Sequence, residues 1–89
     1  MTERNLRIVN EKGLHARASA KFVETVERHQ AEAEVSKDGM TVSGDSIMGL
    51  LMLAASRGTS IDIRTSGNDA EQLADALEAL VADRFGEDY

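Results

Sequence analysis

The stretch AEAEVSKDGMTVS, residues 31–43, decides the fold class of this 89-residue chain. Small or apolar residues alternate with polar ones up to Ser36, and Met40 and Val42 resume the alternation after the dipeptide Asp38-Gly39. An alternation of period two is typical of strands with one buried face, and Asp-Gly favours a tight turn between antiparallel strands. The stretch therefore predicts a β-hairpin.

On both sides of this hairpin, the spacing of apolar residues predicts further strands and helices. Apolar residues spaced by two indicate strands, and those spaced by three and four indicate amphipathic helices. The resulting order is βαββαβα, an α+β arrangement in which one sheet carries its helices on one side. The strand order stays open, because a ferredoxin-like sheet fits the same string. The expected elements are strands at residues 3–9, 31–36, 40–43 and 60–64 and helices at residues 16–28, 47–55 and 68–86.

Two of the expected helices begin with capping residues. Ser46 precedes the short apolar helix, and a serine hydroxyl at that position accepts a hydrogen bond from a first-turn amide. Asn68 is followed three residues later by Glu71, the spacing of a capping box. We therefore expect Ser46 and Asn68 to be the N-caps of the second and third helices.

Length and composition exclude several classes of protein. The chain has apolar surface for one core, so residues 1–89 are expected to form one domain. No cysteine and only two histidines argue against disulfides, a metal site or another cofactor. The formal charge of −6 disfavours nucleic acid. No segment approaches the roughly 20 apolar residues of a membrane span, so we expect a cytoplasmic protein. We also expect a monomer.

The run Gly13-Leu14-His15-Ala16-Arg17 places an imidazole where a loop enters the first helix. The positive end of the helix dipole disfavours imidazolium, so we expect a neutral, nucleophilic ring near pH 7. A phosphoryl group on that ring would be stabilised by the backbone amides of Ala16 and Arg17 and by the Arg17 guanidinium. These properties favour reversible phosphoryl transfer.

Two other interpretations of this histidine are weaker. A lone histidine before a helix can have a purely structural role, with Arg17 as a solvated surface charge. A hydrolase would need a positioned base or water activator, and no Ser-His-Asp, HExxH or paired-carboxylate pattern is present.

Gly13-Leu14-His15-Ala16-Arg17 resembles the active-site motif of the HPr family of phosphohistidine carriers. Asp45-Ser46-Ile47-Met48-Gly49 is similar to a second landmark of that family, at the expected place. The resemblance covers all 89 residues through element order and length. It implies an open-faced β-sandwich: a four-stranded antiparallel sheet in the order 1-4-2-3 with three helices on one face.

The resemblance also implies a function. His15 would take a phosphoryl group on Nδ1 from enzyme I and give it to IIA domains of a phosphotransferase system, in a sugar or a nitrogen-related branch. Arg17 would stabilise the phosphorylated state. The family usually has proline where this chain has Ala18.

By the same resemblance, Ser46 would be phosphorylated by HPr kinase/phosphorylase, although Asp45 already makes that corner negative. An alternative is a non-catalytic regulatory module that acts through phosphorylated Ser46, but such a module would have no use for His15. An RNA- or metal-binding domain is disfavoured by charge and by the lack of cysteines and aromatics. The residues expected to bind partners are Ile47, Met48, Leu51, Met52 and Lys21.

Overall fold

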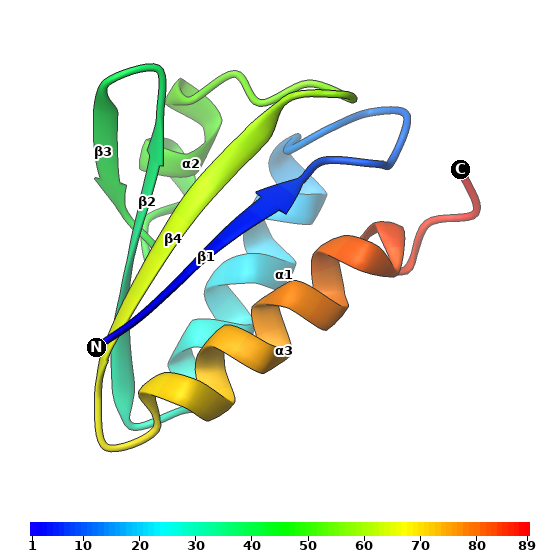
Figure 1. Ribbon diagram of the computed structural model, residues 1–89. Helices are drawn as coiled ribbons and strands as arrows, with labels where there is room; N and C mark the ends of the chain where they lie inside the picture. Colours follow the sequence, from blue (N-terminus) through cyan, green and yellow to red (C-terminus); the bar gives the residue numbers. More distant parts are fainter.

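The computed structural model describes all 89 residues, as four strands and three helices followed by a short 3-10 turn (Figure 1). The order is the βαββαβα expected from the sequence pattern. The elements are β1 (Thr2–Arg7), α1 (Ala16–Glu27), β2 (Ala31–Lys37), β3 (Met40–Ser43), α2 (Ile47–Met52), β4 (Ser60–Gly67), α3 (Ala70–Ala82) and η1 (Arg84–Gly86).

The four strands form one antiparallel sheet in the order β1-β4-β2-β3. β4 is central: its Ile61 lies opposite Leu6 of β1, and its Ile63 lies opposite Val35 of β2. β2 and β3 form the hairpin expected from residues 31–43. The observed order is the one implied by the HPr resemblance, so it decides the question that the hydrophobic pattern left open.

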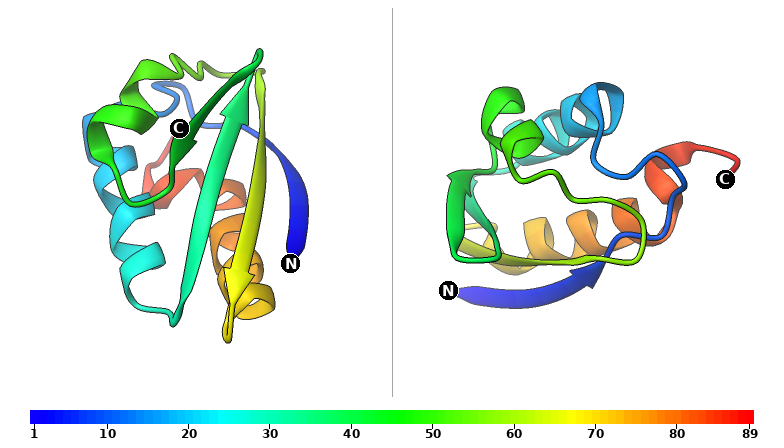
Figure 2. Two further views of the ribbon diagram at one scale, coloured as in Figure 1. Left: turned by 90° about the vertical axis from the view of Figure 1, so that its left-hand side faces the viewer. Right: turned by 90° about the horizontal axis from the view of Figure 1, so that it is seen from above.

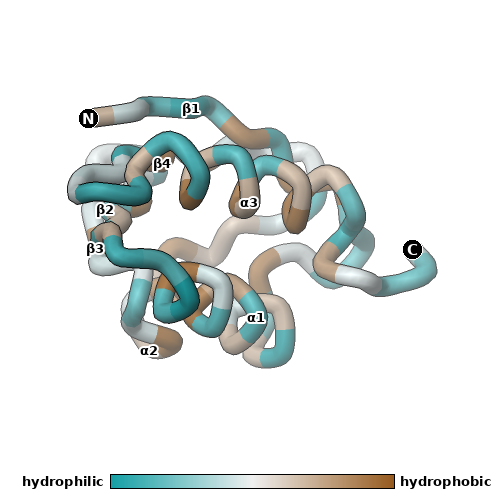
Figure 3. The backbone as a smooth tube through the Cα atoms, turned by 90° about the horizontal axis from the view of Figure 1, so that it is seen from below, coloured by the Kyte–Doolittle hydropathy of each residue, from teal (hydrophilic) through white to brown (hydrophobic).

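All three helices cover the same face of the sheet (Figure 2). α3 packs against β1 and β4, and α1 packs against β2. Hydrophilic and hydrophobic segments alternate along α1 and α3 (Figure 3), and their buried residues, such as Phe22 and Leu77, join the inward residues of the strands in a core of 19 side chains. None of the helices combines the length and the apolar character needed to cross a bilayer.

Two helices end earlier than the sequence pattern predicts. α2 stops at Met52, and the left-handed conformation of Ala54 (φ 51°) prevents continuation towards residue 55. α3 stops at Ala82, and the chain then turns through two consecutive left-handed residues, Arg84 and Phe85. Phe85 is nevertheless fully buried, so its apolar side chain belongs to the core without being helical.

The expected capping box at the start of α3 is wrong. The N-cap is Asp69, not Asn68, and no side chain caps the helix. Asp69 instead accepts a 2.8 Å hydrogen bond from the backbone N–H of Gln30, just before β2. A tertiary contact has replaced the local one, and it ties the start of α3 to the start of β2.

Candidate functional site

His15 is the N-cap of α1, in an extended conformation (φ −79°, ψ −175°). Its side chain makes no capping hydrogen bond. The amides of Ala16, Arg17 and Ala18 lie in the first turn, and none donates to a backbone carbonyl or a side chain. Three N–H donors are therefore open at the positive end of the helix, beside the imidazole.

The loop that carries His15 is anchored to the segment after α2. Leu14 is buried, and its N–H donates to the Ala55 carbonyl at 2.9 Å. Gly13 adopts φ +66°, and a Cβ atom on it would lie 2.5 Å from the same carbonyl oxygen. Ser19 Oγ donates to the Leu14 carbonyl at 3.3 Å from within α1. The backbone next to His15 is therefore held both by the segment after α2 and by α1.

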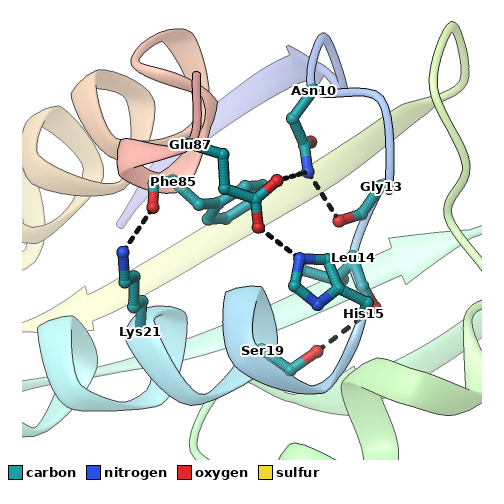
Figure 4. Close-up of polar contacts among 8 residues, drawn as sticks. All are labelled: Asn10, Gly13, Leu14, His15, Ser19, Lys21, Phe85 and Glu87. Carbon is teal, nitrogen blue, oxygen red and sulfur yellow. Dashed lines mark hydrogen bonds and ion pairs between the residues drawn. The ribbon is translucent and has the colours of Figure 1, made fainter. Parts of the chain in front are cut away.

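The imidazole contacts a carboxylate that comes from the far end of the chain (Figure 4). Nε2 of His15 hydrogen-bonds to Oε2 of Glu87, which is 72 residues away. The other carboxylate oxygen accepts from Nδ2 of Asn10 at 3.0 Å, and the same Nδ2 donates to the Gly13 carbonyl at 2.8 Å. The His15 side chain stays 27% exposed, so the ring is accessible and lies outside the apolar interior.

The C-terminal segment is held in place by a second contact. Lys21 Nζ, from α1, donates to the Phe85 carbonyl at 2.7 Å, and the Phe85 ring is fully buried. The left-handed turn at Arg84 and Phe85 directs the following residues back towards the start of α1 (Figure 4). Glu87 thus reaches His15 on an anchored segment.

The sequence pattern gave no indication of Asn10 or Glu87. Neither belongs to an apolar periodicity or a recognised motif, and their contacts join positions 72 and 77 residues apart. Phe85-Gly86 could have signalled a turn after α3, since an apolar residue followed by glycine often ends a helix. Only the path of the folded chain shows what that turn brings to His15.

Opposing effects act on the Glu87 carboxyl. Partial burial alone would raise its pKa, but the hydrogen bonds from Asn10 and His15, with the positive charges of His15 and Lys12, outweigh burial. The pKa of Glu87 therefore lies below its ordinary value. Near neutral pH this residue is an ionised carboxylate and can only accept hydrogen bonds.

Arg17 and Lys21 both lie near the site, but only Lys21 makes a hydrogen bond. With Lys12 and residues 86–89 they line an open depression of about 280 Å³. The Arg17 side chain makes no hydrogen bond or ion pair with His15 or with any other residue. Its guanidinium is therefore free. Lys21 is engaged with the Phe85 carbonyl.

Ser46 is the N-cap of α2, as expected. Its Oγ accepts a 3.0 Å hydrogen bond from the amide of Gly49. Asp45 is exposed, and one of its oxygens accepts from Ser43 Oγ at 2.6 Å. The start of α2 is therefore closed by its own side chain.

α2 divides its apolar residues between the core and the surface. Leu50 and Leu53 are buried, whereas Ile47, Met48 and Met52 are 40%, 70% and 64% exposed. Leu51 is half-buried. The three exposed side chains, Ile47, Met48 and Met52, are called here the α2 patch.

The arrangement around His15 suits an anionic group that is delivered by an activated donor. A partly exposed imidazole stands beside three open amides, with a free guanidinium nearby. No group of three or more His, Cys, Asp or Glu side chains converges as a metal site would require. The features present can receive an anion and stabilise its charge.

Comparison with known proteins agrees with this chemistry. The family model described as "PTS HPr component phosphorylation site" matches residues 2–83. The phosphocarrier protein HPr of Cupriavidus necator is 44% identical over 87 residues, 98% of either chain. The HPr-like protein Crh of Halalkalibacterium halodurans is 40% identical over 82 residues, 92% of this chain and 94% of Crh.

Solved structures give the same result. The crystal structure of HPr-C-His from Thermoanaerobacter tengcongensis matches with a TM-score of 0.95 and 37% identity, and the match covers 100% of each chain. Sequence, sheet order and backbone therefore agree over nearly the full length. The chain belongs to the HPr family of phosphocarriers of the phosphotransferase system.

Proposed function

We propose that His15 accepts a phosphoryl group on Nδ1 from enzyme I and that the chain passes it to IIA domains, in a sugar or a nitrogen-related branch. The observation that carries this proposal is the start of α1, where the imidazole is accessible and three adjacent amides have no partner. Such amides stabilise a dianion but give no assistance to an attacking water. The proposal is therefore a carrier and not a hydrolase.

In this function the amides of Ala16 and Arg17 hold the phosphoryl oxygens, and the Arg17 guanidinium adds a charge-assisted hydrogen bond. The free state of the Arg17 side chain supports this role, because no ion pair has to break first. Arg17→Gln is expected to shorten the lifetime of the phosphorylated protein, with the unmodified fold unchanged.

The test is phosphorylation by phosphoenolpyruvate and enzyme I, read as an acid-labile phosphoryl group. His15→Ala should abolish labelling. His29→Ala is the matched control, because His29 is the only other histidine and its Nδ1 bonds the Thr25 carbonyl at 2.8 Å, away from the site. Labelling that persists in folded His15→Ala protein would overturn the proposal.

We also propose that the α2 patch, with Leu51 and Lys21, docks enzyme I and IIA domains. Three exposed apolar side chains on one short helix support this, since a contiguous apolar patch is a common interaction site. Lys21 contributes charge, because an ammonium with one bond to the Phe85 carbonyl retains two further donors.

The patch is tested by one charged substitution and one control. Met48→Glu should slow transfer to and from the partners. Met40→Glu places the same charge at another exposed methionine, on β3, and should leave transfer unchanged. Equal effects of the two substitutions would contradict docking at α2.

Ser46 is proposed as a regulatory site for HPr kinase/phosphorylase. A phosphate there would sit at the start of α2 and add a charge of roughly −1.5 to −2 beside the α2 patch, next to Asp45. Ser46→Asp should accept phosphoryl groups from enzyme I more slowly than Ser46→Asn, which has the same shape and can still cap the helix. Identical rates would rule out electrostatic inhibition.

A further inference from the structure

We propose that Glu87 is a positioning residue that holds the Nε2 proton of His15 and thereby leaves the lone pair of Nδ1 free as the nucleophile. The inference rests on the proposed function and deepens it, because it says how the C-terminal segment prepares the same ring for phosphoryl transfer. The carrying observation is the bond between Nε2 and Oε2 of Glu87.

The direction of this hydrogen bond determines the tautomer. A neutral imidazole carries one proton, on Nδ1 or on Nε2, and the nitrogen without it is the acceptor. An ionised Glu87 has no proton to donate, so its contact with Nε2 requires that the proton be on Nε2. The remaining lone pair is then on Nδ1, which lies on the side of the ring turned away from Glu87 (Figure 4).

The carboxylate is itself fixed, which a chance surface contact would not be. Oε1 of Glu87 accepts from the fully buried Asn10, and the Glu87 side chain is only 16% exposed. Upstream, the Phe85 carbonyl is held by Lys21 and the Phe85 ring by the core. A carboxylate held this way orients an imidazole, as carboxylates do in catalytic and metal-bound histidines.

The same contact supports the transfer step. As the Nδ1–P bond forms, the bond between phosphorus and the donor atom breaks, and the ring takes on positive charge because its Nε2 proton stays in place. Glu87 offsets that charge through the hydrogen bond. On transfer, a bond forms between phosphorus and the acceptor and the Nδ1–P bond breaks. The imidazole then returns to its neutral form, with its proton still on Nε2. Glu87 never touches the phosphoryl group.

Two variants and one control test the role of Glu87. Glu87→Ala removes the acceptor, and Glu87→Gln keeps the shape but lacks the charge. Asp83→Asn is the control: it removes an equal charge four residues earlier, from an exposed side chain without a hydrogen bond. The ring tautomer is read from the 15N shifts of His15 in unphosphorylated protein, at a pH where the ring is neutral.

The expected result is Nε2–H as essentially the sole tautomer in wild type and in Asp83→Asn, and a mixture with Nδ1–H in Glu87→Ala. Phosphorylation by enzyme I should slow on the order of tenfold in kcat, at unchanged KM, since the lost bond is charge-assisted but partly solvated. Glu87→Gln should lie between wild type and Glu87→Ala.

Unchanged tautomer and rate in both Glu87 variants, with wild type labelled normally, would overturn the role of Glu87 and leave the proposed function intact. A faster rate in Glu87→Ala would also overturn it, because Glu87 would then be restraining the ring. If wild type accepts no phosphoryl group at all, the proposed function itself fails, and the tautomer measurement on unphosphorylated protein still tests the contact with Glu87 separately.

Discussion

The starts of α1 and α2 differ in whether a side chain caps the first-turn amides. Both helices begin after a residue in an extended conformation, His15 and Ser46. The Ser46 hydroxyl accepts from a first-turn amide, whereas the His15 ring turns outward to Glu87 and leaves its amides open. An uncapped helix start forgoes about 1 kcal/mol of stability. The comparison shows that α2 is capped by its own serine, whereas the first-turn amides of α1 have no partner, as the proposed phosphoryl site requires.

The largest expected effect concerns the loop that supports the open start of α1. Gly13→Ala should destabilise the protein by about 3 kcal/mol, because a left-handed residue gains a Cβ that overlaps the Ala55 carbonyl. Gly39→Ala is the control for backbone strain alone: its φ is +84° with nothing within 4 Å, so about 1 kcal/mol is expected. Urea unfolding of both variants measures the difference, and equal losses would show that the contact with Ala55 is unimportant.

The second prediction tests the comparison of helix starts directly. Ser46→Ala should lower the free energy of unfolding by about 1 kcal/mol through loss of the cap. His15→Ala should change it by less than about 0.5 kcal/mol, because His15 does not cap α1 and its ring is partly exposed. Denaturant unfolding of the two variants is the measurement. A larger loss in His15→Ala would show that His15 stabilises its helix after all.

A third prediction concerns Ala18, the third residue of α1. Ala18→Pro should stabilise the protein by about 0.4–1 kcal/mol, because the Ala18 amide makes no hydrogen bond and proline restricts the unfolded chain. Phosphoryl transfer should persist, since the amides of Ala16 and Arg17 remain. Thermal unfolding and labelling by enzyme I check both statements. Ala18 is fully buried, so earlier unfolding would mean that the core cannot accept the larger ring.

The smallest expected effect is the dependence of stability on the ionisation of Glu87. Its pKa is lower in the folded protein than its ordinary value of 4.5, so the stabilisation is present above about pH 4.5 and is lost as pH falls through the folded pKa. Wild type should exceed Glu87→Gln in stability by less than about 0.5 kcal/mol near pH 6, with no difference near pH 3. Urea unfolding across this range, with Asp83→Asn as control, is the measurement; a difference that grows at low pH would contradict the sign.

The elements that could be predicted from the sequence are those encoded by neighbouring residues. The hairpin at residues 31–43, the order of strands and helices and the cap at Ser46 all follow from spacing and local chemistry. The position of His15 at the start of α1 is also predictable, because Gly13 and the change of periodicity mark a loop that enters a helix. The helix ends were less predictable, since α2 and α3 stop where single residues turn left-handed.

Gly49 illustrates how local propensity and tertiary packing diverge. Its low helix propensity counts against α2 in the sequence. In the fold, a Cβ atom at Gly49 would lie 3.0 Å from the Val42 side chain and 3.2 Å from Ser46 Oγ. The glycine lets the helix approach β3 and its own cap, so its value could not be judged before the packing was known.

Local sequence is enough to identify the helices and strands, their buried faces and the position of the imidazole just before α1. Periodicity and capping depend on residues a few positions apart, and such interactions are present in the local sequence. The replacement of the capping box by the Asp69–Gln30 contact and the contact of Glu87 with His15 are visible only in the folded chain, which also fixes the sheet order that the hydrophobic pattern left open. The Gln30–Asp69 and His15–Glu87 contacts join positions 39 and 72 residues apart, and such partners are chosen by how the whole core packs.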